Sequence, residues 1–455
     1  MSSSSQDNLP AGQHNYIASL PNEIFTYIFE YVLEFKTDFV NQRWLEPDET
    51  NKAAQKLALV NRHFNALVTP FLYRCIEIDM GTNVYNRQMK KTKNVIVTLD
   101  TSETLKAHIR ALSIVTIDPR DWQQGGAINL PLRVLTWAVN LSYLRLIEDF
   151  SDSLFSPPLD LASGLIDAAL ERSTSLRHLH LYGIHQSLPL DRVVAALRRY
   201  PPKVTELTLY GRASRSAIRP LITKRAYRKS LIKKLALYHF DGGNTDIRSL
   251  LQWPKVLTEL TIGDYLEAID LDIQSLLLPH EDNLVVLDLG FIVDPDRFNF
   301  SSFTALRVLR MCYWPLITSY REMLAKGEVK QLMAPQLGHI HWYFAGQRPE
   351  DYTLNNFDLF DETWLCDLAR YATEEHPQLR SVSVDYARPA EYDPQFAASG
   401  HAWQIPPYPK ERFGRVKAQY ESFGLKFSYN NPVVLRPRWR NELEHERRAF
   451  EARGL

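Results

Sequence analysis

The sequence predicts an α/β repeat protein, a curved solenoid with parallel strands on its inner side and helices on its outer side. A short apolar pattern, L-x-x-L-x-L, recurs along most of the 455 residues. Segments with helical periodicity lie between the copies. No single unit of this kind can bury its own apolar edge, so the units must stack. A helical stretch of different composition precedes the repeats.

Bulk composition sets limits on the class of protein. The chain is 45% hydrophobic and 23% charged, which is typical of a soluble protein with a substantial core. Lys and Arg together number 53, as do Asp and Glu, so no net field attracts nucleic acid or an anionic membrane. The three scattered cysteines, Cys75, Cys312 and Cys366, favour a reducing compartment. Without a visible signal peptide or a long apolar run, we expect a cytoplasmic and/or nuclear protein with no nucleic-acid or membrane partner.

The repeats follow one rule. In a short strand, alternate side chains point to opposite faces, so the last two apolar positions of each copy share one face. Successive copies are roughly 30 residues apart, a period that suits leucine-rich repeats of variable length. The copies are IRALSIV (109–115), LSYLRLI (141–147), LRHLHLYG (176–183), VTELTLYG (204–211), IKKLALYHF (232–240), LTELTIGD (257–264), LVVLDLG (284–290), LRVLRMC (306–312), LGHIHWY (337–343) and LRSVSVDY (379–386).

The connecting segments are predicted to be helices. The segment PLDRVVAALRRYP places Val193, Val194, Leu197 and Tyr200 near one face before Pro201 ends it. The segments DLASGLIDAALERS and ETWLCDLARYATEE have the same periodicity. Each unit is therefore expected to run as strand, turn, helix and return.

The N-terminal stretch is predicted to form a helical module. Pro21 suits the first position of a helix, and Glu23 in the first turn suits its dipole. Ile24 and Ile28 lie one turn apart, and Phe25, Phe29 and Val32 form an adjoining stripe. A polar segment follows, and then a second helical run, AAQKLALVNRHFNALVTPFLYR, which Pro70 is expected to break. The strand-like segment YRCIEID is expected to begin the sheet.

Two blocks in this stretch resemble an F-box. The first is Leu20-Pro21-x-Glu23-Ile24, followed by Ile28, and the second contains Leu57, Val60, Asn61, Arg62, Phe64, Leu67 and Val68 before PFLYRCIEI. Each block alone is weakly specific, whereas both in this order are moderately specific. With the repeats, the chain is similar to F-box/leucine-rich-repeat proteins of filamentous fungi. The motif match covers about 55 residues, the size of a small helical module.

The resemblance implies a substrate-recognition subunit of an SCF-type ubiquitin ligase. Such a module docks on a Skp-type adaptor and, through it, on a cullin–RING ligase, while the repeats present an unidentified protein target. By position, the resemblance assigns Leu20, Pro21, Ile24, Ile28, Leu57 and Val60 to adaptor binding, as part of the adaptor face of the module or of the core that supports it. Residues 34–52 form an insertion relative to the family, which either loops out or hinders docking. The alternative is a ligase-independent interaction scaffold whose N-terminal helices only cap the solenoid.

No catalytic or metal motif occurs, so the sequence predicts neither an enzyme nor a cofactor. Phosphate-binding glycine loops, G-x-S-x-G, H-E-x-x-H and paired C-x-x-C motifs are all missing. His178 and His180 offer two ligands where a stable zinc site needs three or four. His339 and His341 repeat this pair several units away, too distant to complete the set.

Because the leucines face inward, the polar residues of each strand are expected on the concave face. Tyr182, Tyr210 and Tyr238 have the same offset in three successive repeats. Tyrosines are favoured at binding hot spots, but stacked tyrosines could equally just shield the sheet. The predicted target-binding residues on this face are His178, His180, Tyr182, Glu206, Tyr210, Tyr238, Arg310, His341 and Tyr343.

The predicted domains are an N-terminal tail (1–17), an F-box-like module (18–73) with its insertion (34–52), a leucine-rich-repeat array (74–400) and a C-terminal cap (401–455). The cap contains aromatic and basic residues, and is expected to run as helix, strand, extended link and charged helix. A nucleic-acid role would need a basic face, but Glu442, Glu444 and Glu446 enter the last helix, so capping is favoured.

Overall fold

The structure is a computed structural model of the chain. It describes residues 20–33, 47–79, 86–116, 129–148, 160–188, 190–200, 204–213, 222, 224–238, 240, 244–263, 272–290, 299–312, 328–343, 359–385, 409–429, 444 and 448.

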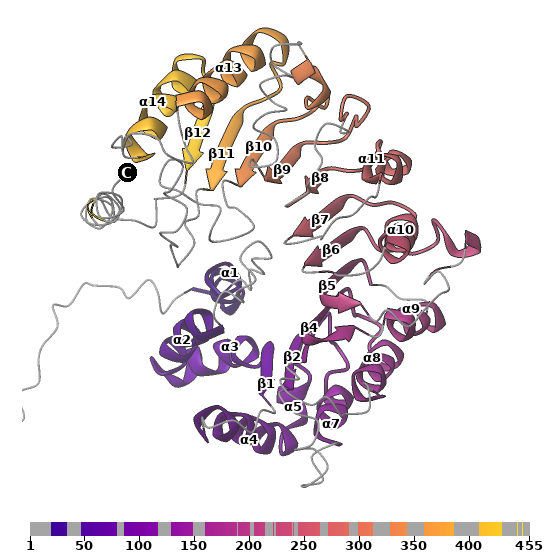
Figure 1. Ribbon diagram of the computed structural model, residues 1–455. Helices are drawn as coiled ribbons and strands as arrows, with labels where there is room; N and C mark the ends of the chain where they lie inside the picture. Colours follow the sequence, from indigo (N-terminus) through magenta and orange to yellow (C-terminus); the bar gives the residue numbers. More distant parts are fainter. Residues whose placement is uncertain are drawn as a thin grey trace, which may run out of the picture.

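A single sheet of 12 parallel strands, paired in the order of the sequence, forms the frame of the molecule (Figure 1). The strands are β1 Cys75–Asp79, β2 Ala111–Thr116, β3 Tyr143–Glu148, β4 His178–Leu188, β5 Glu206–Ala213, β6 Lys234–Tyr238, β7 Glu259–Gly263, β8 Val286–Asp288, β9 Val308–Cys312, β10 His339–Tyr343, β11 Ser381–Asp385 and β12 Lys426–Tyr429. The sheet curves, with its strands on the inner side, and the chain is an α/β repeat solenoid as predicted.

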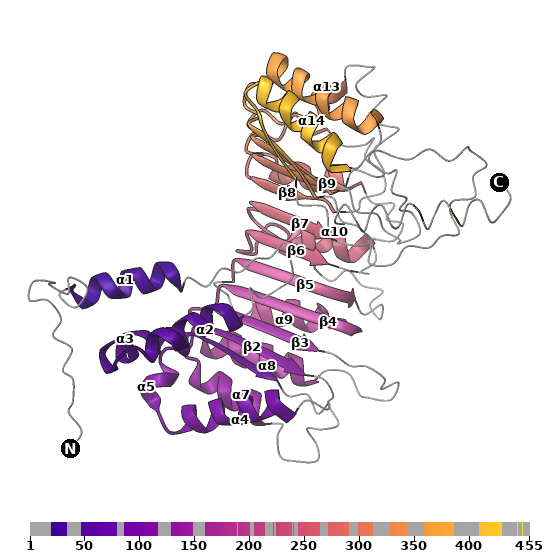
Figure 2. The same ribbon diagram turned by 90° about the vertical axis from the view of Figure 1, so that its left-hand side faces the viewer.

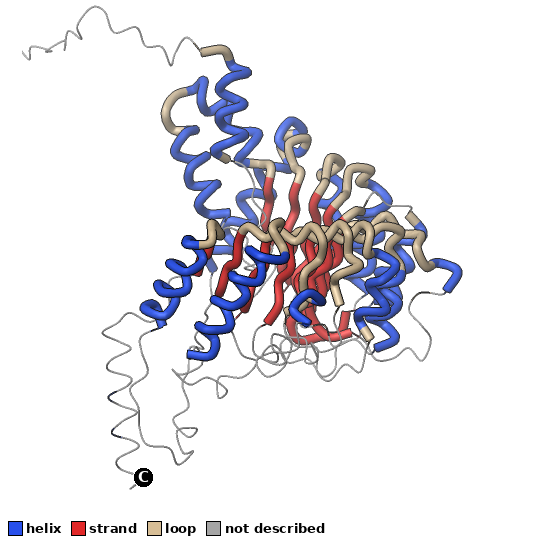
Figure 3. The backbone as a smooth tube through the Cα atoms, turned by 90° about the horizontal axis from the view of Figure 1, so that it is seen from above, coloured by secondary structure: helices blue, strands red, loops and turns tan. Residues whose placement is uncertain are grey.

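The helices that connect the strands lie on the outer, convex side (Figures 1 and 3). They are α4 Asn86–Asp100, α5 Glu103–Lys106, α7 Asn129–Trp137, α8 Asp160–Arg172, α9 Leu190–Arg199, α10 Asn244–Gln252, α11 Ile273–Leu277, α13 Leu359–Glu375 and α14 Pro409–Ser422. Helices α8, α9 and α13 confirm the three helical segments predicted from periodicity. Not every unit has a full helix: the described part of the β5–β6 connection contains only a 3-10 turn at Lys224–Ala226, and that of β9–β10 one at Glu328–Gln331.

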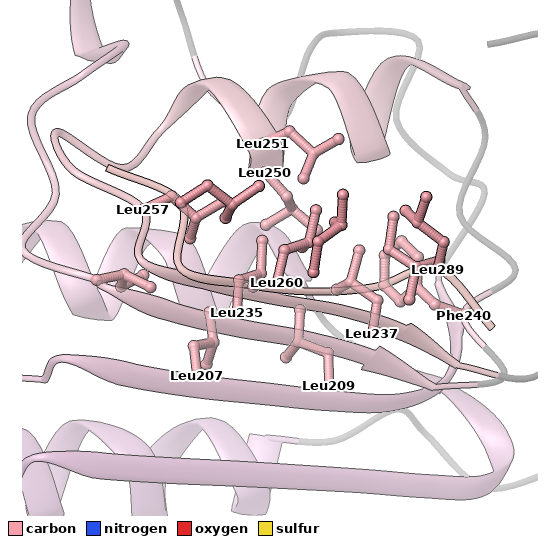
Figure 4. Close-up of a cluster of buried hydrophobic side chains, with 14 of the residues drawn as sticks. Leu207, Leu209, Leu235, Leu237, Phe240, Leu250, Leu251, Leu257, Leu260 and Leu289 are labelled. Carbon is pink, nitrogen blue, oxygen red and sulfur yellow. The ribbon is translucent and has the colours of Figure 1, made fainter. Parts of the chain in front are cut away.

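The core lies between the sheet and the outer helices. In-register pairing aligns one apolar residue of each strand into a continuous buried column, which includes Leu179, Leu207, Leu235 and Leu260. A second column two residues further along includes Leu209 and Leu237. Figure 4 shows the members of both columns on β5 to β7 on the side of the sheet that faces Leu250 and Leu251 of α10, namely Leu207, Leu209, Leu235, Leu237 and Leu260. The stacking that the repeat pattern predicted is therefore confirmed.

A separate helical module precedes the sheet. It consists of α1 Asn22–Val32, α2 Pro47–Ala58 and α3 Arg62–Leu72, and lies at the side of the sheet where the strands begin (Figure 2). Its own core contains Phe25, Phe29, Leu33, Ala54 and Val68, distinct from the large core of the array. The rings of Phe25 and Phe29 contact that of Phe64 edge-on, with centroids 5.1 and 5.6 Å apart. Among the described residues, the module and the array bury separate clusters.

The structure corrects three details of the predicted module. The second helical run is not one helix: it is interrupted at 59–61, where the Asn61 side chain accepts a hydrogen bond from the Phe64 amide and caps α3. Pro70 does not break the run but lies within the last turn of α3. Pro21 is the N-cap residue of α1 rather than its first helical residue.

The two ends of the chain agree in part with the expectations from the sequence. Helix α2 begins at Pro47, so the end of the expected 34–52 insertion is helical, and residues 34–46 lie outside the described ones. Strand β1 begins the sheet, as YRCIEID predicted. In the 401–455 segment, α14 and β12 supply the expected helix and strand, and β12 extends the parallel sheet by pairing with β11. The expected final helix lies mostly outside the described residues.

No helix in the described ranges is long and apolar enough to cross a membrane.

The leucine column should dominate the stability of the array. Leu207 is fully buried at its centre, so Leu207→Ala is expected to cost about 2–5 kcal/mol because it removes buried methyl groups and leaves a cavity. Urea unfolding followed by circular dichroism measures this loss.

Leu231→Ala is the matched control. Its side chain is 55% exposed, and its truncation should change the unfolding free energy by no more than about 0.5 kcal/mol. Equal losses for the two variants would contradict the stacked core.

Candidate functional site

The helical module exposes an apolar surface. Leu20, just before α1, and Ile24, Tyr27, Ile28 and Tyr31 on α1 recur at spacings of three and four residues. All are exposed, Tyr27 and Tyr31 by 72% and 79%. We call these five residues the α1 stripe. Phe25, Phe29 and Leu33 lie on a different face and pack into the module core. Helix α1 is therefore apolar on two faces, of which only one is covered within the described structure.

The predicted adaptor-binding residues divide into two groups. Leu20, Pro21, Ile24, Ile28 and Val60 are exposed. Leu57 is instead half-buried and packs against the module core, which makes it a support for that surface.

Sequence reasoning missed four exposed apolar residues of the module. Tyr27 and Tyr31 belong to the α1 stripe, and Leu59, at the turn between α2 and α3, is 85% exposed. Val32 was expected in one stripe with Phe25 and Phe29, but it is 58% exposed and does not join them in the module core. The signal was present, because Tyr27 and Tyr31 stand three residues after Ile24 and Ile28. The exposure of Leu59 was not predicted, because one continuous helix was expected at this position.

The concave face carries the predicted target-binding residues in register. Tyr182, Tyr210 and Tyr238 are Cα partners on β4, β5 and β6, so the predicted tyrosine alignment is confirmed. The rings of Tyr182 and Tyr210 stack with centroids 5.4 Å apart and planes inclined by 25°. On the other neighbouring strand, the Arg145 guanidinium lies 4.7 Å from the centre of the Tyr182 ring.

Gly263 of β7 makes room for the third tyrosine. A Cβ atom at Gly263 would lie 2.4 and 2.6 Å from Cδ1 and Cε1 of Tyr238. The Tyr238 ring therefore lies over the glycine on the next strand, and only 9% of this residue is exposed. Tyr182 and Tyr210 remain half-buried.

A buried carboxylate links β4 and β5. His178 Nδ1 lies 3.0 Å from Glu206 Oε2, and His180 Nε2 lies 3.4 Å from Glu206 Oε1. Burial alone would raise the pKa of Glu206, but the two histidines outweigh it and lower this pKa to about 2. Because an ionised carboxylate only accepts, His178 donates from Nδ1. Burial lowers the pKa of His180, whose ring also packs 4.7 Å from that of Tyr143.

A second carboxylate lies on β8. Asp288 accepts a hydrogen bond from the Tyr343 hydroxyl at 3.0 Å and one from the Gly290 amide at 3.3 Å. The Arg310 guanidinium lies 3.6 Å away. Burial raises the pKa of Asp288, while Arg310, Gly290 and Tyr343 act in the opposite direction.

A chain of histidines and serines joins β10 to β11. His339 Nδ1 lies 2.8 Å from Ser381 Oγ, His339 Nε2 3.0 Å from Ser383 Oγ, and His341 Nδ1 2.5 Å from Ser383 Oγ. His341 Nε2 lies 3.3 Å from Asp385 Oδ2. The two serine hydroxyls and the two imidazole rings thus form one linked chain from Ser381 to His341, and the Asp385 carboxylate lies beside its end.

The predicted site residues thus all lie on the concave strands, but they are not equally accessible. His180 and Glu206 are buried beneath their neighbours, so a partner would not contact them directly. The described ranges contain no group of three or more His, Cys, Asp or Glu placed to hold a metal ion. The two histidine pairs lie on β4 and β10, with β5 to β9 between them.

The chain has little detectable similarity to known proteins. No family model matches the chain, and no curated protein matches it. Among solved structures, the chain is similar to the leucine-rich repeat-containing protein LegL7 from Legionella pneumophila, with 13% identity and a TM-score of 0.37 over 82% of this chain and 97% of that one. Because this TM-score is low, the description as an α/β repeat solenoid depends on the sheet register of the chain itself.

The contacts of Glu206 with His178 and His180 should make the stability of the fold depend on pH. A pKa lowered from 4.5 to about 2 stabilises the fold above pH 4.5, and this contribution is lost as the pH falls toward 2. Its size is on the order of 3 kcal/mol. Urea unfolding measured from pH 6 to pH 3 should show a smaller loss of stability for Glu206→Gln than for the wild type.

Glu259→Gln is the control for this measurement. Glu259 pairs with Lys234 at 2.8 Å, but its side chain is 39% exposed, and the pH dependence should match that of the wild type. If Glu206→Gln also matches the wild type, Glu206 does not carry the effect.

Proposed function

We propose that the chain is a substrate-recognition adaptor of an SCF-type ubiquitin ligase. The helical module would dock on a Skp-type adaptor, and the concave face of the repeats would bind a protein target. The proposal depends above all on the α1 stripe, an exposed apolar face on a small module that has its own core.

The energetics of the module support docking through this face. Complete burial of one large apolar side chain is worth about 1.5–3 kcal/mol. Ile24 and Ile28 lie one turn apart at the centre of the α1 stripe, with Tyr27 and Tyr31 beside them. Contiguous exposed apolar residues of this kind mark sites of protein interaction. The resemblance of the two sequence blocks to an F-box is the reason for proposing a Skp-type adaptor as the partner.

The proposal assigns no catalysis, metal or cofactor to the chain. The repeat face would hold the target while the ligase supplies the chemistry. Such a subunit would act in the cytoplasm, the nucleus or both.

Charged substitutions on the α1 stripe should abolish adaptor capture. Ile24→Asp together with Ile28→Asp places two carboxylates on the exposed face without changing a residue of the module core. In a pull-down with a purified Skp-type adaptor, we expect recovery to fall at least tenfold.

Val97→Asp is the matched control, because Val97 is 64% exposed on α4, outside the module. Its recovery should equal that of the wild type. Equal recovery of the double variant, with unchanged circular dichroism, would refute docking through the α1 stripe.

Deletion of residues 18–73 distinguishes the ligase role from that of a ligase-independent scaffold. In the ligase role, the truncated chain binds its target but no longer promotes its ubiquitination. If target turnover in cells is unchanged by the deletion, the chain acts as a scaffold and the helices serve only as a cap.

A further inference from the structure

Positive charge is concentrated in the segment that leads into β6. Residues 207–240 contain nine Lys and Arg and no Asp or Glu, although the two kinds of charge are equal in number over the whole chain. Five described cations of this run lie outside the strands, and a sixth lies on the next connection, between β6 and β7; all six are exposed. We call them the basic patch: Lys224, Arg225, Arg228, Lys229, Lys233 and Lys255.

Backbone hydrogen bonds between two repeats bring the patch together. The Lys229 amide donates to the Trp253 carbonyl at 3.1 Å, and the Lys255 amide donates to the Ser230 carbonyl at 3.0 Å. The Arg228 guanidinium lies 3.4 Å from the Lys255 carbonyl. The cations before β6 and the cation before β7 therefore share one surface, at the side of the sheet where the strands begin (Figure 2).

Arg228 has a backbone conformation that residues with a side chain rarely adopt. Its φ is 56°, and no other non-glycine residue in the described ranges has a positive φ. A hydrogen bond from its amide to the Gln252 carbonyl, at 2.9 Å, holds this conformation. Strain of this kind persists only where the surrounding structure enforces it, and it is concentrated at functional sites. The fold of two repeats thus determines where Arg228 and its neighbours lie.

The described residues leave these charges unneutralised. Within the part of the chain that the structure describes, none of the six cations forms an ion pair with a carboxylate. Lys234, the next residue after Lys233, does form one, with Glu259 at 2.8 Å. Uncompensated cations on one surface attract a partner of opposite charge.

The flanks of the patch argue against a nucleic acid. Charge is balanced before β4, where Glu171 adjoins Arg172, and it is negative before β8, where Glu281 and Asp282 lie. A nucleic-acid duplex carries phosphates along its whole length and would be repelled beyond the patch. A single strand binds by stacking its bases on aromatic rings, but Tyr227, in the same segment, packs against the core of the array.

Leu231 favours a protein segment as the partner. It lies between Lys229 and Lys233 in the sequence and is 55% exposed. A phosphate backbone offers no contact to this side chain, and a membrane-binding surface combines its cations with several apolar anchors. A peptide can place carboxylates on the cations and an apolar side chain on Leu231, an arrangement that is usual in protein interfaces. Because the cations are spread over two connections, several single carboxylates fit them better than one phosphate.

We propose that the basic patch binds an acidic segment of a partner protein, rich in Asp and Glu, with an apolar residue that packs on Leu231. The patch lies outside both the α1 stripe and the concave face. The proposal therefore does not depend on the proposed ligase role.

Fluorescence anisotropy with the full-length protein tests the proposal. The probe is a fluorescein-labelled nonapeptide in which eight glutamates surround a central leucine. We expect saturable binding, at least tenfold tighter than that of the same peptide with glutamine in place of glutamate. Because exposed charges are screened by salt, raising NaCl from about 50 mM to about 500 mM should weaken binding at least tenfold. Equal binding of the glutamine peptide would overturn the proposal.

Competition against the labelled peptide distinguishes the other possible partners. The competitors are oligothymidylate, phosphatidylserine vesicles and a nonapeptide with two phosphoserines in place of glutamates and glutamine at the other six glutamate positions. The unlabelled glutamate peptide should displace the probe at the lowest concentration of negative charge. Displacement by any of the three at a lower concentration would assign the patch to that class of partner and overturn the proposal.

Neutral substitutions in the patch should abolish most of the binding. Lys229→Gln, Lys233→Gln and Lys255→Gln together are expected to weaken binding of the glutamate peptide at least tenfold. All three side chains are exposed, so circular dichroism should be unchanged. Leu231→Ser should weaken binding about threefold without changing its salt dependence, and unchanged affinity would contradict the apolar contact.

The matched control removes the same charge from exposed positions elsewhere on the side where the strands begin. It combines Arg307→Gln, Arg380→Gln and Lys426→Gln. This variant should bind the glutamate peptide as the wild type does, and equal weakening of the two triple variants would show a general effect of net charge and overturn the proposal. Both variants should capture the Skp-type adaptor as the wild type does, so the outcome for the patch is independent of that for the α1 stripe.

Discussion

In-register pairing of parallel strands is the constraint on which the rest of this structure depends. It brings one apolar side chain from each strand into a single buried column, in which Leu179, Leu207 and Leu235 are direct neighbours. A shift of any strand by one residue would turn its leucines to the concave side. Burial of the column therefore also determines which residues of each strand face the hollow of the solenoid.

In-register pairing also brings the polar side chains of the concave face close to one another. Side chains on neighbouring strands are close enough to interact directly, so an opposite charge or a donor on the next strand stabilises a charged group on this face. The pairs of His178 with Glu206 and of Lys234 with Glu259 are two examples. The concave face is consequently a set of local networks rather than a row of independent side chains, and its chemistry cannot be judged one residue at a time.

The architecture of the chain could be predicted from the sequence, but many of the contacts between its side chains could not. The periodic leucines predicted the stacked strands, and equal offsets predicted the alignment of Tyr182, Tyr210 and Tyr238. The break between α2 and α3 was missed because the apolar periodicity continues through it. The helix is interrupted by a local hydrogen bond, in which the Asn61 side chain accepts from the Phe64 amide and begins α3. The burial of His180 and Glu206 could not be predicted either, because it depends on side chains from several repeats. For the module, the motif order indicated a docking role, but only coordinates distinguished exposed Ile24 from half-buried Leu57.

The chain of hydrogen bonds from Ser381 to His341 has a consequence for the rotamers of both strands. Each serine hydroxyl of β11 contacts an imidazole nitrogen of β10, and the Ser383 hydroxyl contacts both rings at once. A χ rotation of either histidine therefore breaks hydrogen bonds to serines on the adjacent strand. The side-chain conformations at this end of the solenoid are consequently coupled, and a substitution at Ser383 would release both rings together.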